Sequence, residues 1–336
     1  MAATVERSHV HLCFIDPRDE TCALHHVDVA ALFHSEPDPD PGAMEVGALE
    51  LPSHAARFQR PPDPLHTTMG FHLLGRDKVV AVDGLRRTLI YAAANGAVRA
   101  GPMLRVAKRH AVSASVGGGL YLLDHIPRRE ERRCFEALLH APLREDWCWH
   151  RLPQPPYVRE PGYTPSAVVA HAVAGDAIWT STKGGVGTYS FDTRRRAWKK
   201  EGGWALPFHG KAEHVPQCGL WFGIASSADR RLCAADLAGA GADAAPEVRG
   251  AWEDFRPPKE WFWRNSAVVH LGSGKLCTVR FFGTDPTDVV WRNRSPVVVL
   301  TGVEVEPQED GGIRMVRHRS SCIKLPEHYR HLNWIL

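Results

Sequence analysis

Residues 178–198 read IWTSTKGGVGTYSFDTRRRAW, and this stretch decides the fold class. Runs of apolar and β-branched residues lie on both sides of the Gly184-Gly185 pair, which is the pattern of strands joined by a turn. Successive side chains of a strand point to opposite faces, so Tyr189 and Phe191 share one face. The stretch therefore predicts antiparallel strands with a buried aromatic face, followed by Trp198 at the end of the unit.

The same arrangement of an apolar run, a turn glycine and a second apolar run recurs along the chain. A tight hairpin turn requires a positive φ, which glycine adopts without steric cost. The turn glycines are Gly75, Gly118, Gly175, Gly219 and Gly274. They are separated by 43, 57, 44 and 55 residues. About 40 to 50 residues per repeat is the spacing of four-stranded propeller blades.

These repeats predict an all-β chain that folds as a single β-propeller domain over residues 1–336. Five units lie between about residues 67 and 318, and strands expected at His9–Ile15 and Cys22–Ala30 supply a sixth, composite blade. Seven blades are the alternative. We expect the N-terminal strands to pair with a C-terminal strand, for which Ser321–Leu325 is the candidate, because closure of the ring removes exposed sheet edges.

One long segment interrupts the repeats near the N-terminus. Residues 35–66 are rich in proline and acidic residues. Such a composition is typical of a surface connection rather than of a buried strand. Within it, Glu45–Leu51 is the one stretch that could add a strand to the edge of a sheet.

The series Gly184-Gly185, Tyr189 and Trp198 resembles the kelch repeat. In kelch blades the glycine pair lets two backbones approach closely, while the tyrosine and tryptophan pack between neighbouring blades. Nearly the whole chain is also similar to a large grass-plant family, the domain of unknown function 1668, whose members are described as kelch-like propellers. Stretches that carry this similarity include Cys134–His140, Gly219–Gly223 and Thr301–Glu306. The resemblance implies a plant protein with a propeller fold, and it implies no particular chemistry.

Composition and charge argue against several classes of protein. The chain has 336 residues, of which 44% are hydrophobic, and a net charge of +3, whereas a dedicated nucleic-acid binder carries a strong basic excess. Apolar runs of eighteen residues and a signal-peptide pattern are both missing. Eight cysteines without a C-x-x-C pair favour buried, reduced thiols. We expect an intracellular protein, cytoplasmic or nuclear, that binds neither membrane nor nucleic acid.

Motifs of known chemistry are also missing from the sequence. No G-x-S-x-G occurs, and Gly210-Lys211 is followed by Ala212, which breaks the phosphate-binding loop pattern. The group Cys22, His25, His26 and Asp28 contains metal-ligand residue types, but strand alternation sends the two histidines to opposite faces. The sequence therefore predicts no cofactor, no metal and no catalytic residue.

The candidate interaction residues are aromatic and basic. Trp261 and Trp263 form the densest aromatic group, with Lys259, Glu260 and Arg264 beside them, and aromatic residues surrounded by Arg and Lys are typical anchors of protein interfaces. Packing inside the protein is the alternative for these rings. Arg194, Arg195 and Arg196 form a basic cluster at an expected hairpin turn, where solvation is the alternative.

From these features we interpret the chain as a non-enzymatic module that binds a protein partner through loops of a repeat scaffold. The alternative is a propeller enzyme or small-ligand binder with its site in the central channel, which a deep polar pocket with several titratable groups would indicate. The sequence indicates neither the identity of the partner nor the oligomeric state.

Overall fold

The computed structural model confirms that the chain is an all-β protein. It describes residues 7–33, 46–62, 68–108, 110–284, 296–309, 311–326, 328–329 and 332–336. Twenty-five strands occur in this part of the chain. Helical structure there is limited to three short 3₁₀ segments, at Ala30–Phe33, Pro142–Arg144 and Pro156–Arg159. Among the described residues, no helix has both the length and the apolar character that a membrane crossing requires.

The chain divides into two compact units, which are described separately. Unit 1 comprises residues 1–59, 211–236 and 248–336, and unit 2 comprises residues 60–210 and 237–247. A single propeller domain over residues 1–336, its six blades and its closure stay predictions.

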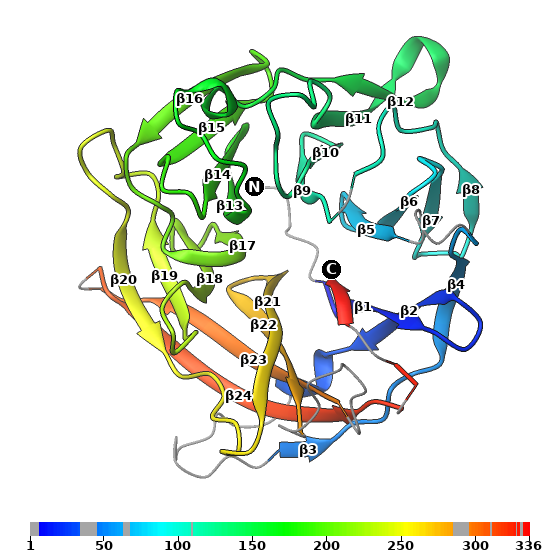
Figure 1. Ribbon diagram of the computed structural model, residues 1–336. Coiled ribbons are helices and arrows are strands. Elements are labelled where there is room, and N and C mark those ends of the chain that lie inside the picture. Colours follow the sequence, from blue (N-terminus) through cyan, green and yellow to red (C-terminus); the bar gives the residue numbers. More distant parts are fainter. Residues whose placement is uncertain are drawn as a thin grey trace. The chain divides into compact units, whose positions relative to one another are not determined.

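Unit 2 contains three sets of four antiparallel strands, and each set follows chain order (Figure 1). The first set is β5 (Met69–Leu74), β6 (Lys78–Asp83), β7 (Thr88–Ala92) and β8 (Val98–Ala100). The second set is β9 (Val112–Val116), β10 (Gly119–Leu123), β11 (Phe135–Ala141) and β12 (Asp146–Arg151). The third set is β13 (Val168–Ala174), β14 (Ala177–Thr182), β15 (Thr188–Asp192) and β16 (Ala197–Gly202).

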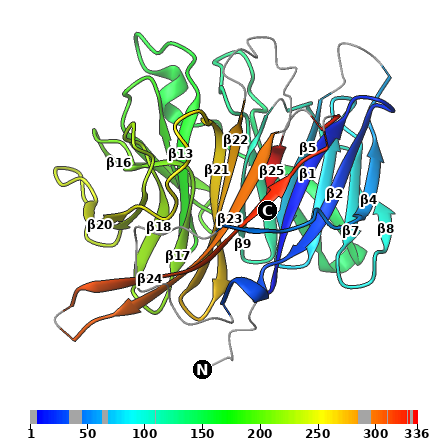
Figure 2. The ribbon, with the colours of Figure 1, turned by 90° about the horizontal axis from the view of Figure 1, so that it is seen from below.

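Unit 1 is built from segments that are far apart in the sequence. One sheet has the order β25-β1-β2-β4, with β1 (His9–Asp16), β2 (Thr21–Asp28), β4 (His54–Gln59) and β25 (Leu332–Ile335); Figure 2 shows β1, β2 and β4 side by side. A second sheet has the order β21-β22-β23-β24-β3, with β21 (Phe262–Gly272), β22 (Lys275–Gly283), β23 (Val297–Pro307), β24 (Ile313–Lys324) and β3 (Val46–Ala48). Two further strands lie wholly in unit 1, β18 (Leu220–Ala225) and β19 (Leu232–Asp236). Two more strands, β17 (Phe208–Val215) and β20 (Glu247–Trp252), begin in unit 2 and end in unit 1.

The turn glycines lie where the sequence predicted them. Each sits in the turn of a hairpin, namely β5-β6, β9-β10, β13-β14, β17-β18 and β21-β22. Their φ values are +68° for Gly75, +78° for Gly118, +60° for Gly175, +66° for Gly219 and +77° for Gly274. A side chain with a Cβ atom is strained at such φ values, so the recurrence of glycine follows from the turn geometry.

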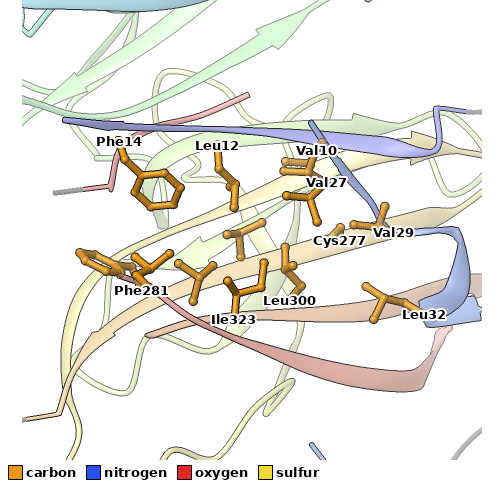
Figure 3. Close-up of a cluster of buried hydrophobic side chains, with 14 of the residues drawn as sticks. Val10, Leu12, Phe14, Val27, Val29, Leu32, Cys277, Phe281, Leu300 and Ile323 are labelled. Carbon is orange, nitrogen blue, oxygen red and sulfur yellow. The ribbon is translucent and has the colours of Figure 1, made fainter. Parts of the chain in front are cut away.

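The largest buried cluster of unit 1 forms between its two sheets (Figure 3). Val10, Leu12 and Phe14 alternate along β1 and point toward the second sheet, whose Phe281 and Leu300 face them. These five side chains are at most 3% exposed. Full burial of an aliphatic or aromatic side chain contributes about 1.5–3 kcal/mol. This packing holds the N-terminal strands against the C-terminal part of the chain.

The predicted pairing of the chain ends needs one correction. β1 and β2 match the strands expected at His9–Ile15 and Cys22–Ala30, and a C-terminal strand does pair with β1. That strand is β25, however, and not Ser321–Leu325. Residues 321–324 instead complete β24, which pairs along its length with the Val-rich strand β23.

The proline-rich and acidic connection contains more structure than the sequence indicated. The edge strand expected at Glu45–Leu51 is present in part, as β3 over Val46–Ala48, which pairs in parallel with β24. The strand β4 was not predicted, and it pairs with β2. Residues 35–45 and 63–66 of this connection, which include Glu45, lie outside the described residues.

Candidate functional site

Unit 1 carries a large apolar groove next to its edge strand. The groove has a volume of about 990 Å³. One wall is formed by residues 46–51, which include β3. The other wall is formed by residues 255–259 and Trp261. Cys322 and Lys324 at the end of β24, together with Pro326, complete the lining. We call it the Trp261 groove. Its volume lies at the upper end of the range for ligand sites in proteins.

Trp261 is half-buried, so one part of its ring anchors the wall and another part faces the groove. The ring packs on Phe255 and Phe282, with centroid separations of 6.4 Å and 5.6 Å. Phe255 and Phe282 are buried in the small core that also holds Val297 and Val299. The wall is therefore held in place by packing, which is what a preformed binding surface requires.

An ion pair beneath the same wall fixes the backbone before Phe255. Asp254 is fully buried and accepts hydrogen bonds from Arg280 Nε at 2.8 Å and from Thr278 Oγ1 at 2.7 Å. A second hydrogen bond runs from Arg280 Nη2 to the other carboxylate oxygen. Arg280 Nη2 also donates to the carbonyl oxygen of Arg230 at 3.0 Å. A charge-assisted bidentate pair of this kind is both strong and directional.

Trp263, the second predicted aromatic residue, has a different role in the structure. It belongs to β21, and the guanidinium of Arg230 lies 3.6 Å from the centroid of its ring. Its indole Nε1 donates a hydrogen bond to Ser266 Oγ at 3.1 Å. Trp263 does not line the groove. Of the two tryptophans, Trp261 lines the groove, and Trp263 packs against the same small core as its wall.

The charged side chains around the groove are mostly positive. Among the described residues of the lining, Arg256, Lys259 and Lys324 are positive and Glu50 is negative. Arg256 is paired with Glu253, whose carboxylate accepts hydrogen bonds from it at 3.1 Å and 2.5 Å. Lys259 and Lys324 are exposed. The rim of the groove therefore presents positive charge around an apolar floor.

The groove offers few groups for acid–base or nucleophilic chemistry. Its lining contains the carboxylate of Glu50 and the thiol of Cys322, and burial raises the pKa of Cys322. A raised thiol pKa disfavours the thiolate, which is the reactive form. A general acid–base site requires titratable groups within hydrogen-bond reach of one another, and the described lining of the groove does not provide such a pair.

The histidines near the N-terminus are engaged in packing. His25 Nδ1 lies 2.7 Å from the carbonyl oxygen of Pro52, and its ring lies edge-on to Phe14. His26 lies beside His11 instead, with ring centroids 4.4 Å apart. The two neighbouring histidines therefore have different surroundings, as strand alternation predicts. In the described part of the chain, no three His, Cys, Asp or Glu side chains are grouped so that they could hold a metal.

Arg194, Arg195 and Arg196 are exposed and lie in the turn between β15 and β16 of unit 2. Arg194 Nε lies 2.8 Å from a carboxylate oxygen of Asp176, and Arg196 donates to the carbonyl oxygen of Arg151 at 2.9 Å. None of the three lines the Trp261 groove. Their part in an interaction stays a prediction.

The sequence pointed to Trp261 but missed the other wall of the groove. Val46, Leu49 and Leu51 belong to the stretch predicted as an edge strand, and nothing local indicated that they lie near Trp261. The contribution of Lys324, from the end of β24, was not foreseen either. Pairing between β3 and β24 brings these segments together, and this pairing spans more than 270 residues of sequence.

A separate cluster of titratable groups is buried in unit 2. Lys108 Nζ lies 3.2 Å from Glu136 Oε2, and both side chains are at most 1% exposed. Asp124 is near them and is 8% exposed. Burial raises the pKa of Asp124 to about 7, with the positive charge of Lys108 acting in the opposite direction. Lys108 Nζ also donates a hydrogen bond to the carbonyl oxygen of Arg133 at 2.8 Å, and we interpret the cluster as structural.

Replacing Asp124 by asparagine is expected to stabilise the protein at pH 8. The pKa of Asp124 in the folded state lies above the unfolded value of 3.8. The stability that Asp124 contributes to the folded state is therefore fully present below pH 3.8, and it is lost as the pH rises from 3.8 toward 7. Asparagine mimics the neutral carboxyl at every pH. In urea unfolding, the advantage of the variant should grow by about 2–3 kcal/mol between pH 5 and pH 8. Glu130→Gln, at an exposed neighbouring acid, is the control, and equal pH profiles for the two variants would contradict the assignment.

Comparison with known proteins identifies the family of this chain. A family model with the description "Protein of unknown function (DUF1668)" matches residues 7–323. A search of curated proteins finds no match. Solved structures that match include the crystal structure of the β-propeller domain of Cps50 (Swd1) from Myceliophteria thermophila. That domain is 11% identical, with a TM-score of 0.41, and the match covers 91% of this chain and 85% of that chain.

Proposed function

This chain belongs to the DUF1668 family of proteins of unknown function. From the surface of the chain itself, we propose that it is a non-enzymatic protein-interaction module. The Trp261 groove is the observation that carries the proposal. It joins a half-buried tryptophan, exposed prolines at positions 257 and 258, and exposed cationic side chains. Aromatic residues and arginine are enriched in protein interfaces.

Binding of a small metabolite is the competing function, since the volume of the groove would accommodate one. Small-ligand sites place a few convergent polar groups around an apolar cavity to fix the orientation of the ligand. The groove has its charges on long, exposed lysine side chains instead. Such a rim suits a larger partner that carries complementary charge, because charge complementarity gives specificity and speeds association.

A pair of matched variants tests the interaction function. Val46 lines the groove and is 37% exposed, whereas Val248 is 49% exposed and lies on β20 outside it. We expect Val46→Glu to abolish the capture of a specific partner from native tissue, because a carboxylate would be buried at the interface. Val248→Glu should leave capture unchanged. The partner is then identified, and its affinity for both variants is measured with purified proteins.

Two results would contradict the proposal. The first is equal capture by the two variants, which would place the interaction elsewhere. The second is a metabolite that binds the purified protein stoichiometrically in a thermal-shift screen and is displaced by Val46→Glu, which would favour the small-ligand function.

We also propose that the strand sets form a single kelch-like propeller of six blades, in which the paired N-terminal and C-terminal strands supply one blade. The recurrence of glycine-turned hairpins and the pairing of β25 with β1 support it. Radial repetition of sheets in a propeller leaves only short, protected edges. A crystal structure in which the sheets do not surround a common axis would refute this arrangement. A crystal structure with seven blades would refute it as well.

A further inference from the structure

We propose that the Trp261 groove receives an extended peptide of the partner, rich in apolar and acidic residues, which adds a strand to β3. This inference rests on the proposed function, because it specifies how the partner binds the same groove. Strand addition is one of the common ways in which proteins bind peptides, with backbone hydrogen bonds supplying affinity and pockets supplying specificity.

The outer edge of β3 has the geometry for a guest strand. Among the described residues, β3 is the last strand of its sheet, and all three of its residues are exposed. Ala48 lies opposite Cys322, and the Leu49 amide donates to the Cys322 carbonyl oxygen at 3.0 Å. Backbone groups of successive residues alternate between the two edges of a strand. The amide and the carbonyl of Ala48 therefore point away from β24, toward the place of a guest strand.

The apolar part of the groove lies beside this edge. Side chains of a guest strand alternate between its two faces, so every second one would lie over the groove. There it would meet Val46 on one wall, and Trp261 and Phe255 on the other. Leu49 and Leu51 belong to the first wall and are half-buried, and their packing against the core of unit 1 holds this wall in place. The groove thus selects apolar side chains at alternate positions of the guest.

The charge of the rim favours acidic residues in the guest. Lys259 and Lys324 are exposed, and in the part of the lining that the structure describes Glu50 is the one acidic side chain. Asp or Glu residues flanking the apolar positions would meet positive charge, whereas Lys or Arg would meet repulsion. Complementary charge of this kind contributes to specificity and to the rate of association.

Selection of random nonapeptides displayed on phage against the full chain tests the proposal. We expect enrichment of sequences that alternate Val, Ile, Leu or Phe with other residues and that carry Asp or Glu. For one enriched peptide, each amide is then methylated in turn. Methylation of alternate amides should lower affinity about tenfold, and methylation of the intervening amides should change it less than about twofold, because every second amide faces β3.

Variants of the protein test the same contacts from the other side. Ala48→Pro removes the outward amide and is compatible with an edge strand, so it should weaken the peptide about tenfold. Lys324→Glu should also weaken an acidic peptide severalfold, by replacing attraction with repulsion. The matched control is Arg319→Glu, at an exposed position of β24 that does not line the groove. Circular dichroism and thermal melting verify that each variant is folded.

The outcomes separate this inference from the proposed function. Loss of the partner with Val46→Glu, together with a methylation scan that shows no alternation, would leave the interaction function in place and overturn strand addition. Failure to enrich any peptide, or equal effects of Lys324→Glu and Arg319→Glu, would also overturn it. Strand addition would also be overturned if a single-stranded dT20 oligonucleotide bound more tightly than every enriched peptide, since that result would identify the rim as a nucleic-acid surface.

Discussion

Replacement of Arg280 by methionine is expected to lower the free energy of unfolding by about 3–5 kcal/mol. Arg280 is 6% exposed, and its partner Asp254 is 0% exposed. Removing the guanidinium leaves a buried carboxylate with one hydrogen bond from a neutral group, Thr278 Oγ1. The large loss arises from this uncompensated charge rather than from the attraction within the pair. Equilibrium unfolding in urea measures the effect.

A double variant distinguishes the two sources of the loss. Arg280→Met combined with Asp254→Leu removes both charges and keeps apolar volume, so it should recover most of the stability. If the double variant were as unstable as the single variant, packing rather than the buried charge would be responsible. Because Asp254 directly precedes Phe255, the single variant should also weaken partner binding, and the double variant should restore part of it.

The features that the sequence predicted well are those set by local geometry. The turn glycines have positive φ because a tight hairpin turn demands it, whatever lies around it. Tyr189 and Phe191 share a face because strand alternation is a property of the backbone. The edge strand at Glu45–Leu51 was visible for the same reason, since an apolar stretch stood out within a proline-rich and acidic segment.

The candidate site was only partly visible because it depends on pairing between distant segments. Trp261 and Trp263 are two residues apart and looked equivalent, yet Trp261 precedes β21 and lines the groove, whereas Trp263 lies within β21 under Arg230. The Asp254–Arg280 pair joins residues on either side of β21, and no local pattern indicates which arginine an aspartate selects. The wrong choice of C-terminal strand has the same cause, because several apolar segments could have paired with β1.

The series that suggested the kelch repeat provides the second large effect, at Trp198. Its ring packs on both Phe135 of β11 and Phe191 of β15, at centroid distances of 5.4 Å and 5.2 Å, and these two rings also contact each other. Its indole Nε1 donates to the Pro153 carbonyl oxygen at 2.8 Å. The tryptophan therefore joins strands of two successive sets within unit 2. Packing between neighbouring sheets is the role that the resemblance implied for it.

Trp198→Ala should accordingly lower the free energy of unfolding by about 3–5 kcal/mol, as loss of a large aromatic side chain from a core does. The ring is half-buried, so a value near the lower end is expected. Trp198→Phe keeps an aromatic ring packed on Phe135 and Phe191 and loses the hydrogen bond, so its cost should be about 1 kcal/mol. A nearly neutral Trp198→Ala would mean that the ring is solvated and that the two strand sets are held together by Phe135 and Phe191 alone. A large loss for both variants would instead make the indole hydrogen bond, and not the aromatic packing, the main contact between the sets.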